Sequence, residues 1–527
     1  MTENTHDLST IVKAYDVRGR AGEDLTDEVA RALGAAFSDQ LDAAAIIVAH
    51  DMRVSSPQLS AAFIDGAVRR GSTVARAGLS STDQLYCASG LHRAAGAMFT
   101  ASHNPPADNG IKLCLPGARP ISRDSGLDDI RRRAEAYLDT GEIPERPGGR
   151  AEDIDTLADY VDTVLSLVSV PTRRRLRVVV DAGNAMAGLT MPAVAERLDS
   201  VDVIPLYFEL DGTFPHHQAN PLDPATLTDL QARVQADDAD LGLAFDGDAD
   251  RCIAVDETGR IVPPSALTAL IAAREIDRAR ADGESEPVVV ANLVSSRHVK
   301  DAIRAAGGRR VRSRVGHSLI KALMAEHDAV FGGEHSAHYY FRDFFYADSG
   351  MLAALHLLAA LAATDGPLSA LIAQHDPYAS SGEINSRVPD VAAAMQRVQQ
   401  WADRIGKVSS DQLDGLALEH WADGAASSEQ WWLSLRASNT EPLLRLNVEA
   451  AEHATMERIR DEVLEIVRTE VPAESSGADI PSWLRAALRC PACHAELRDR
   501  TAALECTDCG ARYAVREGIA MLTEPEE

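Results

Sequence analysis

The sequence is poor in cysteine and in basic residues, and each shortage narrows what the protein can be. Seven cysteines occur among 527 residues. Three of them, Cys87, Cys114 and Cys252, are scattered among apolar neighbours and are interpreted as small buried hydrophobes. Basic residues number 52 against 80 acidic ones, a formal net charge of −28. This charge argues against a general binder of nucleic acid or acidic membranes, which needs basic surfaces. It leaves open a small anionic substrate, because a site can be locally basic inside an acidic shell.

Long apolar runs are also missing. The longest, around Met351 to Ala363, contains His356 and falls short of the roughly 20 residues that cross a bilayer. It predicts a buried helix instead. The first ten residues are polar and include Glu3 and Asp7, whereas a secretory signal has a basic start followed by an apolar run. We therefore expect a cytoplasmic protein without a membrane partner.

Apolar strands alternate with helical patterns along much of the chain. Runs at Ala45–Ala49, Val178–Val180 and Val288–Val290 each begin such a unit, and this alternation is typical of α/β architecture with largely parallel sheets. After about Pro377 the pattern becomes that of a smaller α+β domain, with helical stretches flanking strand-like runs. At about 150 residues per domain, the length is that of three or four domains.

One polar turn offers a candidate nucleophile. The segment Thr100-Ala-Ser-His-Asn-Pro105 is followed by Asn109-Gly-Ile-Lys112, and its proline favours a turn over a helix interior. A turn exposes the Ser102 hydroxyl, but a hydroxyl needs a base, a metal or prior phosphorylation to react. Taken alone, the segment is better interpreted as an ordinary polar turn, and it becomes a candidate only together with partner motifs.

An acidic loop follows an apolar strand at Asp246-Gly-Asp-Ala-Asp-Arg251. Three carboxylates at alternate positions repel one another unless a cation neutralises them, and oxygen ligands favour Mg²⁺ or Ca²⁺. A calcium EF-hand is disfavoured because Arg251 stands where that loop needs glycine. A solvated acidic loop without a metal is the remaining alternative.

Two further loops carry polar groups suited to a phosphorylated sugar. In Gly332-Gly-Glu-His-Ser-Ala-His338, a carboxylate beside a hydroxyl can accept from and donate to sugar hydroxyls. In Arg436-Ala-Ser-Asn-Thr-Glu-Pro442, with Arg445 beyond, an arginine and neighbouring hydroxyl and amide groups favour a phosphate cradle. Common surface loops and a capping turn are the plain alternatives.

Taken together, these segments resemble the α-D-phosphohexomutase superfamily, and most closely its phosphomannomutase/phosphoglucomutase branch. The likeness covers roughly residues 10–470 and preserves the family's order of motifs. The motifs are Tyr15-Asp-Val-Arg-Gly19, Thr100-Ala-Ser-His-Asn-Pro105 with Asn109-Gly-Ile-Lys112, Asp246-Gly-Asp-Ala-Asp-Arg251, Val315-Gly-His-Ser-Leu-Ile-Lys321, Glu334-His-Ser-Ala-His338 and Arg436-Ala-Ser-Asn-Thr-Glu-Pro442. One departure is Ala337, which stands where the family usually has glycine and restricts the backbone if positive φ is needed.

The resemblance implies three related α/β domains and a smaller α+β fourth domain around a central cleft. We expect residues 1–148 to form domain I with the phosphoserine and residues 149–256 to form domain II with the metal loop. Residues 257–376 would then form domain III with the sugar loop, and residues 377–470 domain IV with the phosphate cradle. A linker at 471–481 and a small zinc-ribbon-like segment at 482–527 would complete the chain.

The resemblance also implies a reaction and a role for each matching residue. The enzyme would interconvert hexose 6-phosphate and hexose 1-phosphate, most of all the mannose phosphates and also glucose phosphates, through a phosphoserine and a hexose 1,6-bisphosphate that also serves as activator. Ser102 would carry the phosphoryl group and bind Mg²⁺ with Asp246, Asp248 and Asp250. The further catalytic residues implied are His103, Lys112, Arg251 and His338. The substrate-binding residues implied are Tyr15, Arg18, His317, Glu334, Ser336, Arg436, Ser438, Asn439, Thr440 and Arg445. Six basic residues would make the cleft locally positive: Arg18, Lys112, Arg251, Lys321, Arg436 and Arg445.

The remaining cysteines form two pairs near the C-terminus, Cys490-Pro-Ala-Cys493 and Cys506-Thr-Asp-Cys509. Four thiolates in two such pairs suit a tetrahedral structural Zn²⁺, and a cytoplasmic setting disfavours disulfides. The segment also resembles Trm112-like small proteins, which implies a stabilising appendage or a docking site for a protein partner.

Two alternatives to a phosphomannomutase remain at this point. Phosphoglucosamine mutase belongs to the same superfamily, and only its substrate differs. A non-catalytic interaction protein would work through the cysteine segment, although every catalytic motif is intact.

Overall fold

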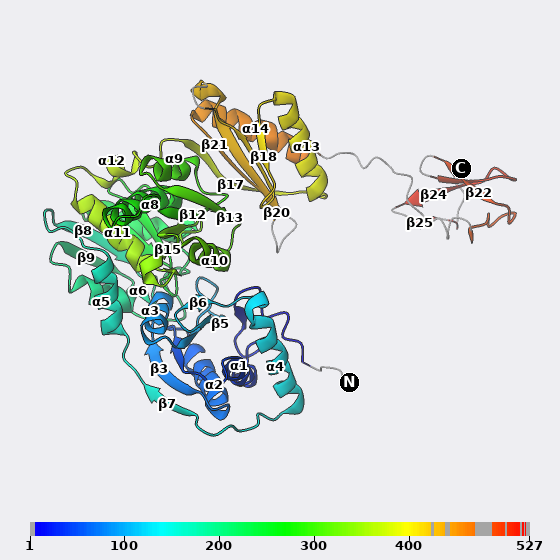
Figure 1. The fold of residues 1–527 in the computed structure, drawn as a ribbon. Helices are drawn as coiled ribbons and strands as arrows, with labels where there is room; N and C mark the ends of the chain where they lie inside the picture. Colours follow the sequence, from blue (N-terminus) through cyan, green and yellow to red (C-terminus); the bar gives the residue numbers. More distant parts are fainter. Residues whose placement is uncertain are drawn as a thin grey trace. The chain divides into compact units, whose positions relative to one another are not determined.

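A computed structural model describes residues 6–422, 426–437, 443–469, 487–500, 503–516, 519–520 and 522. The chain divides into two compact units, and Figure 1 shows their helices and strands. The first comprises Met1–Ile384, Lys407–Arg436 and Arg445–Glu457. The second comprises Asn385–Gly406, Ala437–Leu444 and Arg458–Glu527.

The first unit begins with a seven-stranded sheet that presents the turn of Ser102. Its strands run in the order β1-β5-β4-β2-β3-β7, with β6 paired to β5. Their bounds are β1 Val17–Arg20, β2 Ile46–His50, β3 Thr73–Leu79, β4 Ala95–Phe99, β5 Asp108–Leu115, β6 Arg119–Pro120 and β7 Arg150–Asp153. The strands β2, β3, β4 and β7 are parallel, whereas β5 is antiparallel to both β1 and β4. The accompanying helices are α1 Asp27–Gln40, α2 Ser56–Arg69, α3 Thr82–His92 and α4 Leu127–Thr140.

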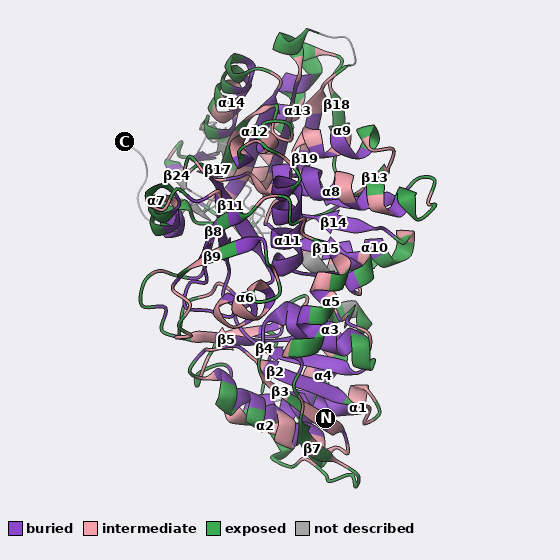
Figure 2. Cartoon of the chain, turned by 90° about the vertical axis from the view of Figure 1, so that its left-hand side faces the viewer, coloured by how far each residue is buried: buried purple, intermediate pink, exposed green. Residues whose placement is uncertain are grey.

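Close helix packing stabilises this sheet's core. A Cβ atom at Gly34 of α1 would lie 2.0 Å from the carbonyl oxygen of Phe63, and one at Gly66 of α2 would lie 1.9 Å from that of Arg31. Only glycine therefore lets α1 and α2 approach so closely. Phe63 lies between Phe37 and Phe99, at ring-centroid distances of 6.1 and 5.5 Å. The strand β4 is buried throughout, whereas α2 alternates buried and exposed residues (Figure 2).

Two further sheets follow in the first unit: the second is mainly parallel, and the third combines a parallel part, β13-β12-β14, with an antiparallel part, β14-β15-β16. The second has the order β11-β10-β8-β9, and the third has the order β13-β12-β14-β15-β16. Their bounds are β8 Leu176–Asp181, β9 Val201–Leu206, β10 Leu241–Phe245, β11 Cys252–Asp256, β12 Val288–Asn292, β13 Arg309–Ser313, β14 Phe331–Gly333, β15 Tyr339–Phe341 and β16 Ala347–Asp348. The helices are α5 Leu157–Leu167, α6 Ala187–Ala195, α7 Thr228–Ala236, α8 Pro264–Ala281, α9 Arg297–Ala305, α10 His317–His327, α11 Gly350–Ala362 and α12 Leu368–Ile372. The helix α11 is buried along its whole length, as its apolar sequence predicts. Among the described residues, no helix is long and apolar enough to span a bilayer.

A fourth, five-stranded sheet has the order β17-β21-β20-β19-β18. Its bounds are β17 Ala379–Arg387, β18 Ser409–Asp411, β19 Leu416–His420, β20 Trp431–Ala437 and β21 Leu443–Ala450. The second unit contains α13 Val391–Ile405 and most of α14 His453–Arg468. These two helices contact each other, because Trp401 Nε1 donates a hydrogen bond to Glu462 at 3.2 Å. Short 3₁₀ turns occur at Arg123–Ser125, Pro224–Leu227, Arg342–Phe344 and Ser427–Glu429.

The second unit also holds a small sheet with the strands β22 Leu497–Arg500, β23 Ala503–Cys506, β24 Arg512–Arg516 and β25 Ile519–Ala520, in that order. Its buried core consists of Cys490, Cys506 and Tyr513. The predicted fold class is confirmed: three α/β sheets are followed by a smaller α+β part and a ribbon-like C-terminal segment.

Candidate active site

The Ser102 turn connects β4 to β5 in a strained backbone conformation. Ser102 has φ +50°, in the left-handed region, which costs a residue with a Cβ atom roughly 1–2 kcal/mol. Its N–H donates to Thr100 Oγ1 at 2.9 Å, and the residue is only 3% exposed. The conformation must therefore be maintained by the surroundings of the turn.

Arg53 provides much of that support. Its guanidinium is fully buried and donates to four backbone carbonyls of the turn, those of Ser102 and Asn104 at 2.7 Å each, Pro105 at 2.7 Å and Asp108 at 3.1 Å. Arg53 Nε lies 3.2 Å from Asp51 Oδ2. The sequence motifs did not predict a role for Arg53 or Asp51. Their position could have indicated one, because they follow the apolar strand β2 as Asp246 follows β10.

The acidic loop between β10 and β11 lies against this turn. Ser102 Oγ donates to Asp246 Oδ2 at 2.7 Å, and Arg251 contacts both groups, at 3.1 Å from the hydroxyl and 2.8 Å from the carboxylate. A Cβ atom at Gly247 would lie 2.3 Å from the carbonyl oxygen of Ser102. Glycine at this position therefore allows the two loops to meet.

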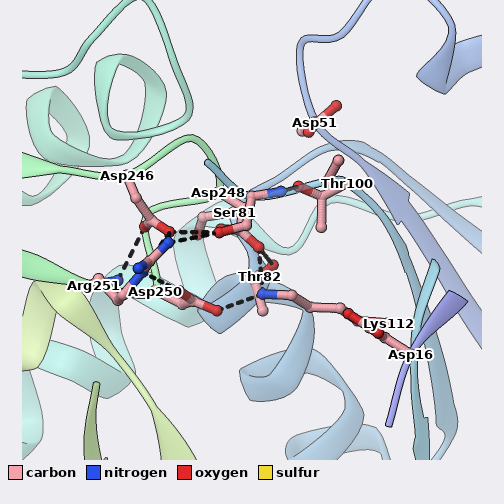
Figure 3. Close-up of polar contacts among 12 residues, drawn as sticks. Asp16, Asp51, Ser81, Thr82, Thr100, Lys112, Asp246, Asp248, Asp250 and Arg251 are labelled. Atoms are coloured by element: carbon pink, nitrogen blue, oxygen red, sulfur yellow. Dashed lines mark hydrogen bonds and ion pairs between the residues drawn. The ribbon is translucent and has the colours of Figure 1, made fainter. Parts of the chain in front are cut away.

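Lys112 links the other two aspartates of the loop (Figure 3). Its ammonium lies 2.6 Å from Asp248 Oδ2 and 2.6 Å from Asp250 Oδ2, and Thr82 Oγ1 donates to Asp248 Oδ2 at 2.6 Å. Burial tends to raise the pKa of Asp248, but the Lys112 ammonium outweighs it and the pKa is lowered. Burial and the neighbouring Asp248 charge raise the pKa of Asp250. The pKa of Lys112 rises despite burial because two carboxylates face it, so this side chain stays charged.

The three aspartates fit a divalent cation. Asp246, Asp248 and Asp250 each offer one oxygen, and these atoms lie within 4.8 Å of one another. Asp248 Oδ1 and Asp250 Oδ1 are buried and find no hydrogen-bond partner among the described residues. Buried carboxylate oxygens without partners are costly, and an all-oxygen ligand set matches Mg²⁺. The donor chemistry therefore supports a Mg²⁺ site beside Ser102.

His103 and Arg18 also contact the Ser102 turn. His103 Nδ1 is 3.3 Å from Ser102 Oγ, and burial, followed by the charges of Arg251 and Arg18, lowers its pKa to about 3. The imidazole is therefore neutral at physiological pH. Arg18 donates to the carbonyl of Ala101 at 2.8 Å and to Asn104 Oδ1 at 3.1 Å. Both predicted residues thus contact the Ser102 turn or its hydroxyl.

The third sheet contributes His338 to the same cluster. His338 Nδ1 lies 2.9 Å from Asp348 and 3.8 Å from Asp250, and its backbone bridges to that of Arg251. Burial tends to lower the pKa of His338, but the two carboxylates outweigh it and the pKa is raised. Asp348 also pairs with Lys321 at 2.7 Å. The motif search missed the role of Asp348.

Glu334 is oriented within the loop that leads to His338. Its carboxylate accepts from Tyr340 Oη at 2.8 Å and from the N–H of Gly316 at 3.2 Å. Ser336 follows at a half-buried position, and Ala337 has φ +63°. The position where the family usually has glycine therefore does need positive φ in this chain.

The remaining predicted substrate-binding residues are only partly described. Tyr15 lines a small cavity together with Lys112 and Lys321. His317 begins α10, but the structure does not describe its side chain. Three further predicted residues, Ser438, Asn439 and Thr440, lie outside the described part of the chain. Arg436 and Arg445 flank Glu383 at 3.9 and 3.3 Å. Arg436 Nε is buried and has no hydrogen-bond partner among the described residues.

The four C-terminal cysteines form a separate cluster. Their sulfur atoms lie within 4.8 Å of one another, with Cys490 and Cys509 3.6 Å apart and Cys493 and Cys506 3.3 Å apart. The N–H groups of Asp508 and Cys509 point to Cys506 Sγ at 3.4 Å each. The Tyr513 hydroxyl lowers the pKa of the Cys490 thiol to about 6. A sulfur-only set of four suits Zn²⁺.

Known sequences and structures match this chain along most of its length. Four families, phosphoglucomutase/phosphomannomutase alpha/beta/alpha domains I, II and III and the C-terminal domain, match residues 9–139, 158–259, 264–378 and 383–466, respectively. Residues 467–527 lie beyond these matches.

Individual relatives agree with the domain matches. The phosphomannomutase of Escherichia coli K12 is 36% identical over 447 residues, which is 84% of this chain and 95% of its own length. A relative named phosphohexose mutases, from Xanthomonas campestris pv. campestris strain ATCC 33913, is 38% identical over 86% of this chain and 98% of its own length. A solved phosphoglucomutase/phosphomannomutase family protein from Burkholderia thailandensis superimposes with a TM-score of 0.76 at 30% identity, covering 88% of this chain and 98% of its own.

Proposed function

The chain belongs to the phosphoglucomutase/phosphomannomutase family and is a phosphohexomutase, and from this premise we propose that it interconverts mannose 6-phosphate and mannose 1-phosphate. The observation that carries the proposal is the convergence of Ser102, the three aspartates and Arg251 at one point. The relatives called phosphomannomutase support mannose as the sugar. Glucose phosphates are proposed as further substrates.

In the proposed reaction, a phosphorylated Ser102 donates its phosphoryl group to the free hydroxyl of a hexose phosphate. The resulting hexose 1,6-bisphosphate turns over in the site, and its other phosphoryl group returns to Ser102. The serine oxygen is a leaving group in the first step and a nucleophile in the second. Such transfers depend mainly on positioning and charge stabilisation.

The residues around Ser102 divide these tasks. Arg251, 3.1 Å from Ser102 Oγ, stabilises the charge on the serine oxygen as the phosphoryl group leaves. Lys112, 2.6 Å from both Asp248 and Asp250, would supply positive charge and an N–H donor beside the reacting groups. His103, neutral and with its Nδ1 3.3 Å from Ser102 Oγ and in contact with Arg251, would help to orient the serine, while Asp246 accepts the hydrogen bond of the serine hydroxyl at 2.7 Å.

Two further groups of residues would hold the ligands. Asp246, Asp248 and Asp250, together with the phosphoserine, would bind Mg²⁺, which supplies further charge neutralisation when bound. Glu334 and Ser336 would bind sugar hydroxyls, with His338 beside them. Arg436 and Arg445, with Ser438, Asn439 and Thr440, would bind the phosphate that is not transferred. Hexose 1,6-bisphosphate would load Ser102 as an activator.

We propose that Cys490, Cys493, Cys506 and Cys509 hold a structural Zn²⁺. A segment this small gains stability from a metal, and the short sulfur distances support tetrahedral coordination. The segment would stabilise the chain or serve as a docking site for a protein partner.

The experiment that tests the proposal compares kcat/KM for mannose 1-phosphate, glucose 1-phosphate and glucosamine 1-phosphate. Preference for glucosamine 1-phosphate would make the protein a phosphoglucosamine mutase instead. Ser102→Ala should abolish turnover and the phosphopeptide formed with hexose 1,6-bisphosphate. Ser166→Ala, at an exposed position on α5, is the control and should retain both. Near-normal turnover in Ser102→Ala would overturn the assignment.

A further inference from the structure

A second polar cavity lies within the first unit, away from the Ser102 cluster. It has a volume of about 260 Å³. Its walls come from β13, from the β12–α9 connection and first turns of α9, and from β18, β19 and Trp432 of β20. None of its lining residues belongs to the catalytic cluster or to the proposed phosphate cradle.

The cavity concentrates positive charge in a strongly acidic protein. Four of its lining residues are basic, whereas two are acidic. The basic residues are Arg297, Lys300, Arg310 and Arg312. The acidic residues, Asp411 and Glu419, do not balance them.

The two carboxylates are already engaged by three of the cations. Arg312 pairs with Asp411, and Arg297 pairs with Glu419. Lys300 lies 3.7 Å from the same Glu419 oxygen. The guanidinium of Arg310, by contrast, makes no ion pair or hydrogen bond within the described part of the chain.

Arg310 is therefore a half-buried cation beside Arg312 and Arg297, and the Asp301 carboxylate, which pairs with Arg297 at 3.4 Å, offsets their charge only in part. Burial, followed by repulsion from Arg312 and Arg297, lowers its pKa to about 10. Burial and the charges of Arg297 and Arg310 likewise lower the pKa of Lys300. A desolvated, unpaired guanidinium among like charges destabilises the fold unless an anion neutralises it.

The geometry points to a binding site in this cavity for a small anion with several negative charges, of the phosphate or diphosphate class. Arginine side chains in a fork arrangement bind phosphate oxygens bidentately. Ser295, Ser409 and Ser410 line the same cavity, and Trp432 and Leu293 form an apolar part of its wall. The anion would bridge the third and fourth sheets. The site is independent of the proposed mutase reaction, because it shares none of its residues.

Pyrophosphate is the probe, titrated into the full-length enzyme by isothermal calorimetry without Mg²⁺. The wild type should bind at the Arg310 cavity and also in the catalytic cleft. Arg310→Gln should weaken the cavity binding about tenfold or more, because a charge-assisted contact is lost, and should retain the cleft binding. Arg436→Ala should show the reverse. Arg304→Gln, which removes an exposed arginine of α9 outside the cavity, is the matched control and should titrate like the wild type.

Titration with ADP distinguishes the source of the phosphate groups. If ADP binds more tightly than pyrophosphate, the organic part of the ligand contacts the Trp432 wall. If the two bind equally, the site recognises the phosphate groups alone. Both results support the anion site. Identical titrations of Arg310→Gln and the wild type, or no cavity binding of either probe, would overturn it.

A stability measurement separates anion binding from a merely structural role. In phosphate-free buffer, Arg310→Met should have a Tm equal to or above that of the wild type, because repulsion among the cations is relieved. Pyrophosphate should then raise the Tm of the wild type more than that of Arg310→Met. A Tm of Arg310→Met several degrees below the wild type without anion would show that Arg310 is a structural cation and would contradict the proposal.

Discussion

Replacing Arg53 by methionine tests how the Ser102 turn keeps its strained conformation. The variant removes four donors to the carbonyls of Ser102, Asn104, Pro105 and Asp108. It also leaves Asp51 fully buried opposite an apolar side chain. Burial already raises the pKa of Asp51, and Arg53 is the main group that opposes this rise.

The expected loss follows from these contacts. Removing one partner of a buried ion pair destabilises a protein by about 3–5 kcal/mol. Displacement of the turn should lower kcat at least about 100-fold, because misplacing a reacting group by about 1 Å has that effect. Arg53→Lys should recover little, since an ammonium cannot span four carbonyls as the planar guanidinium does.

The double variant Asp51→Asn/Arg53→Met makes the prediction specific. It removes both charges, so its unfolding free energy in urea should exceed that of Arg53→Met, while its kcat remains low because the turn is still unsupported. Arg76→Met is the matched control. Its exposed ion pair with Asp153 should contribute at most about 1 kcal/mol. Mutase turnover at the wild-type rate in a folded double variant would refute the positioning role of Arg53.

Three other predictions follow from single sites. Arg436→Ala should raise KM about tenfold or more with a smaller effect on kcat, and a fall in kcat at unchanged KM would contradict the cradle. Metal analysis of the full chain should find Zn²⁺ that is lost in Cys493→Ser, whereas a wild-type protein with four free thiols and no zinc would refute an occupied site. Burial raises the pKa of Asp83 from 3.8 to about 6, so the folded state binds this proton more tightly and the group's contribution to stability falls as pH rises. Between about pH 4 and pH 7, the wild type should therefore lose about 2 kcal/mol relative to Asp83→Asn, and parallel pH profiles of their unfolding free energies would contradict this.

The positions of Ser102 and Asp246 could be predicted from the sequence, Ser102 from its polar turn that ends at Pro105 and Asp246 from its place directly after an apolar strand. A strand that runs directly into polar residues delivers them to one edge of a sheet, and β4 and β10 both do so. Arg53 follows β2 in the same way, but the residues around it include neither a candidate nucleophile nor a group of metal ligands. Arg53 acts through backbone carbonyls, of which that of Ser102 lies 49 residues further along the chain. Every residue has a backbone carbonyl, so the sequence does not indicate which ones Arg53 contacts.

Positive φ angles are a second feature of the site that the sequence pattern does not indicate. Ser102, Ala249 and Ala337 all have positive φ, at +50°, +60° and +63°, although none is glycine. Each lies in a loop of the proposed active site, where such strain persists only if the surroundings enforce it. Thr100 and Arg53 hold the Ser102 backbone through hydrogen bonds. The residues on either side of Ala249, Asp248 and Asp250, are both held by ion pairs with Lys112. Two carboxylates of the proposed Mg²⁺ site, Asp248 and Asp250, therefore also anchor the strained loop through Lys112. It follows that removing the charge of Lys112 should disturb the loop as well as the electrostatics of the site.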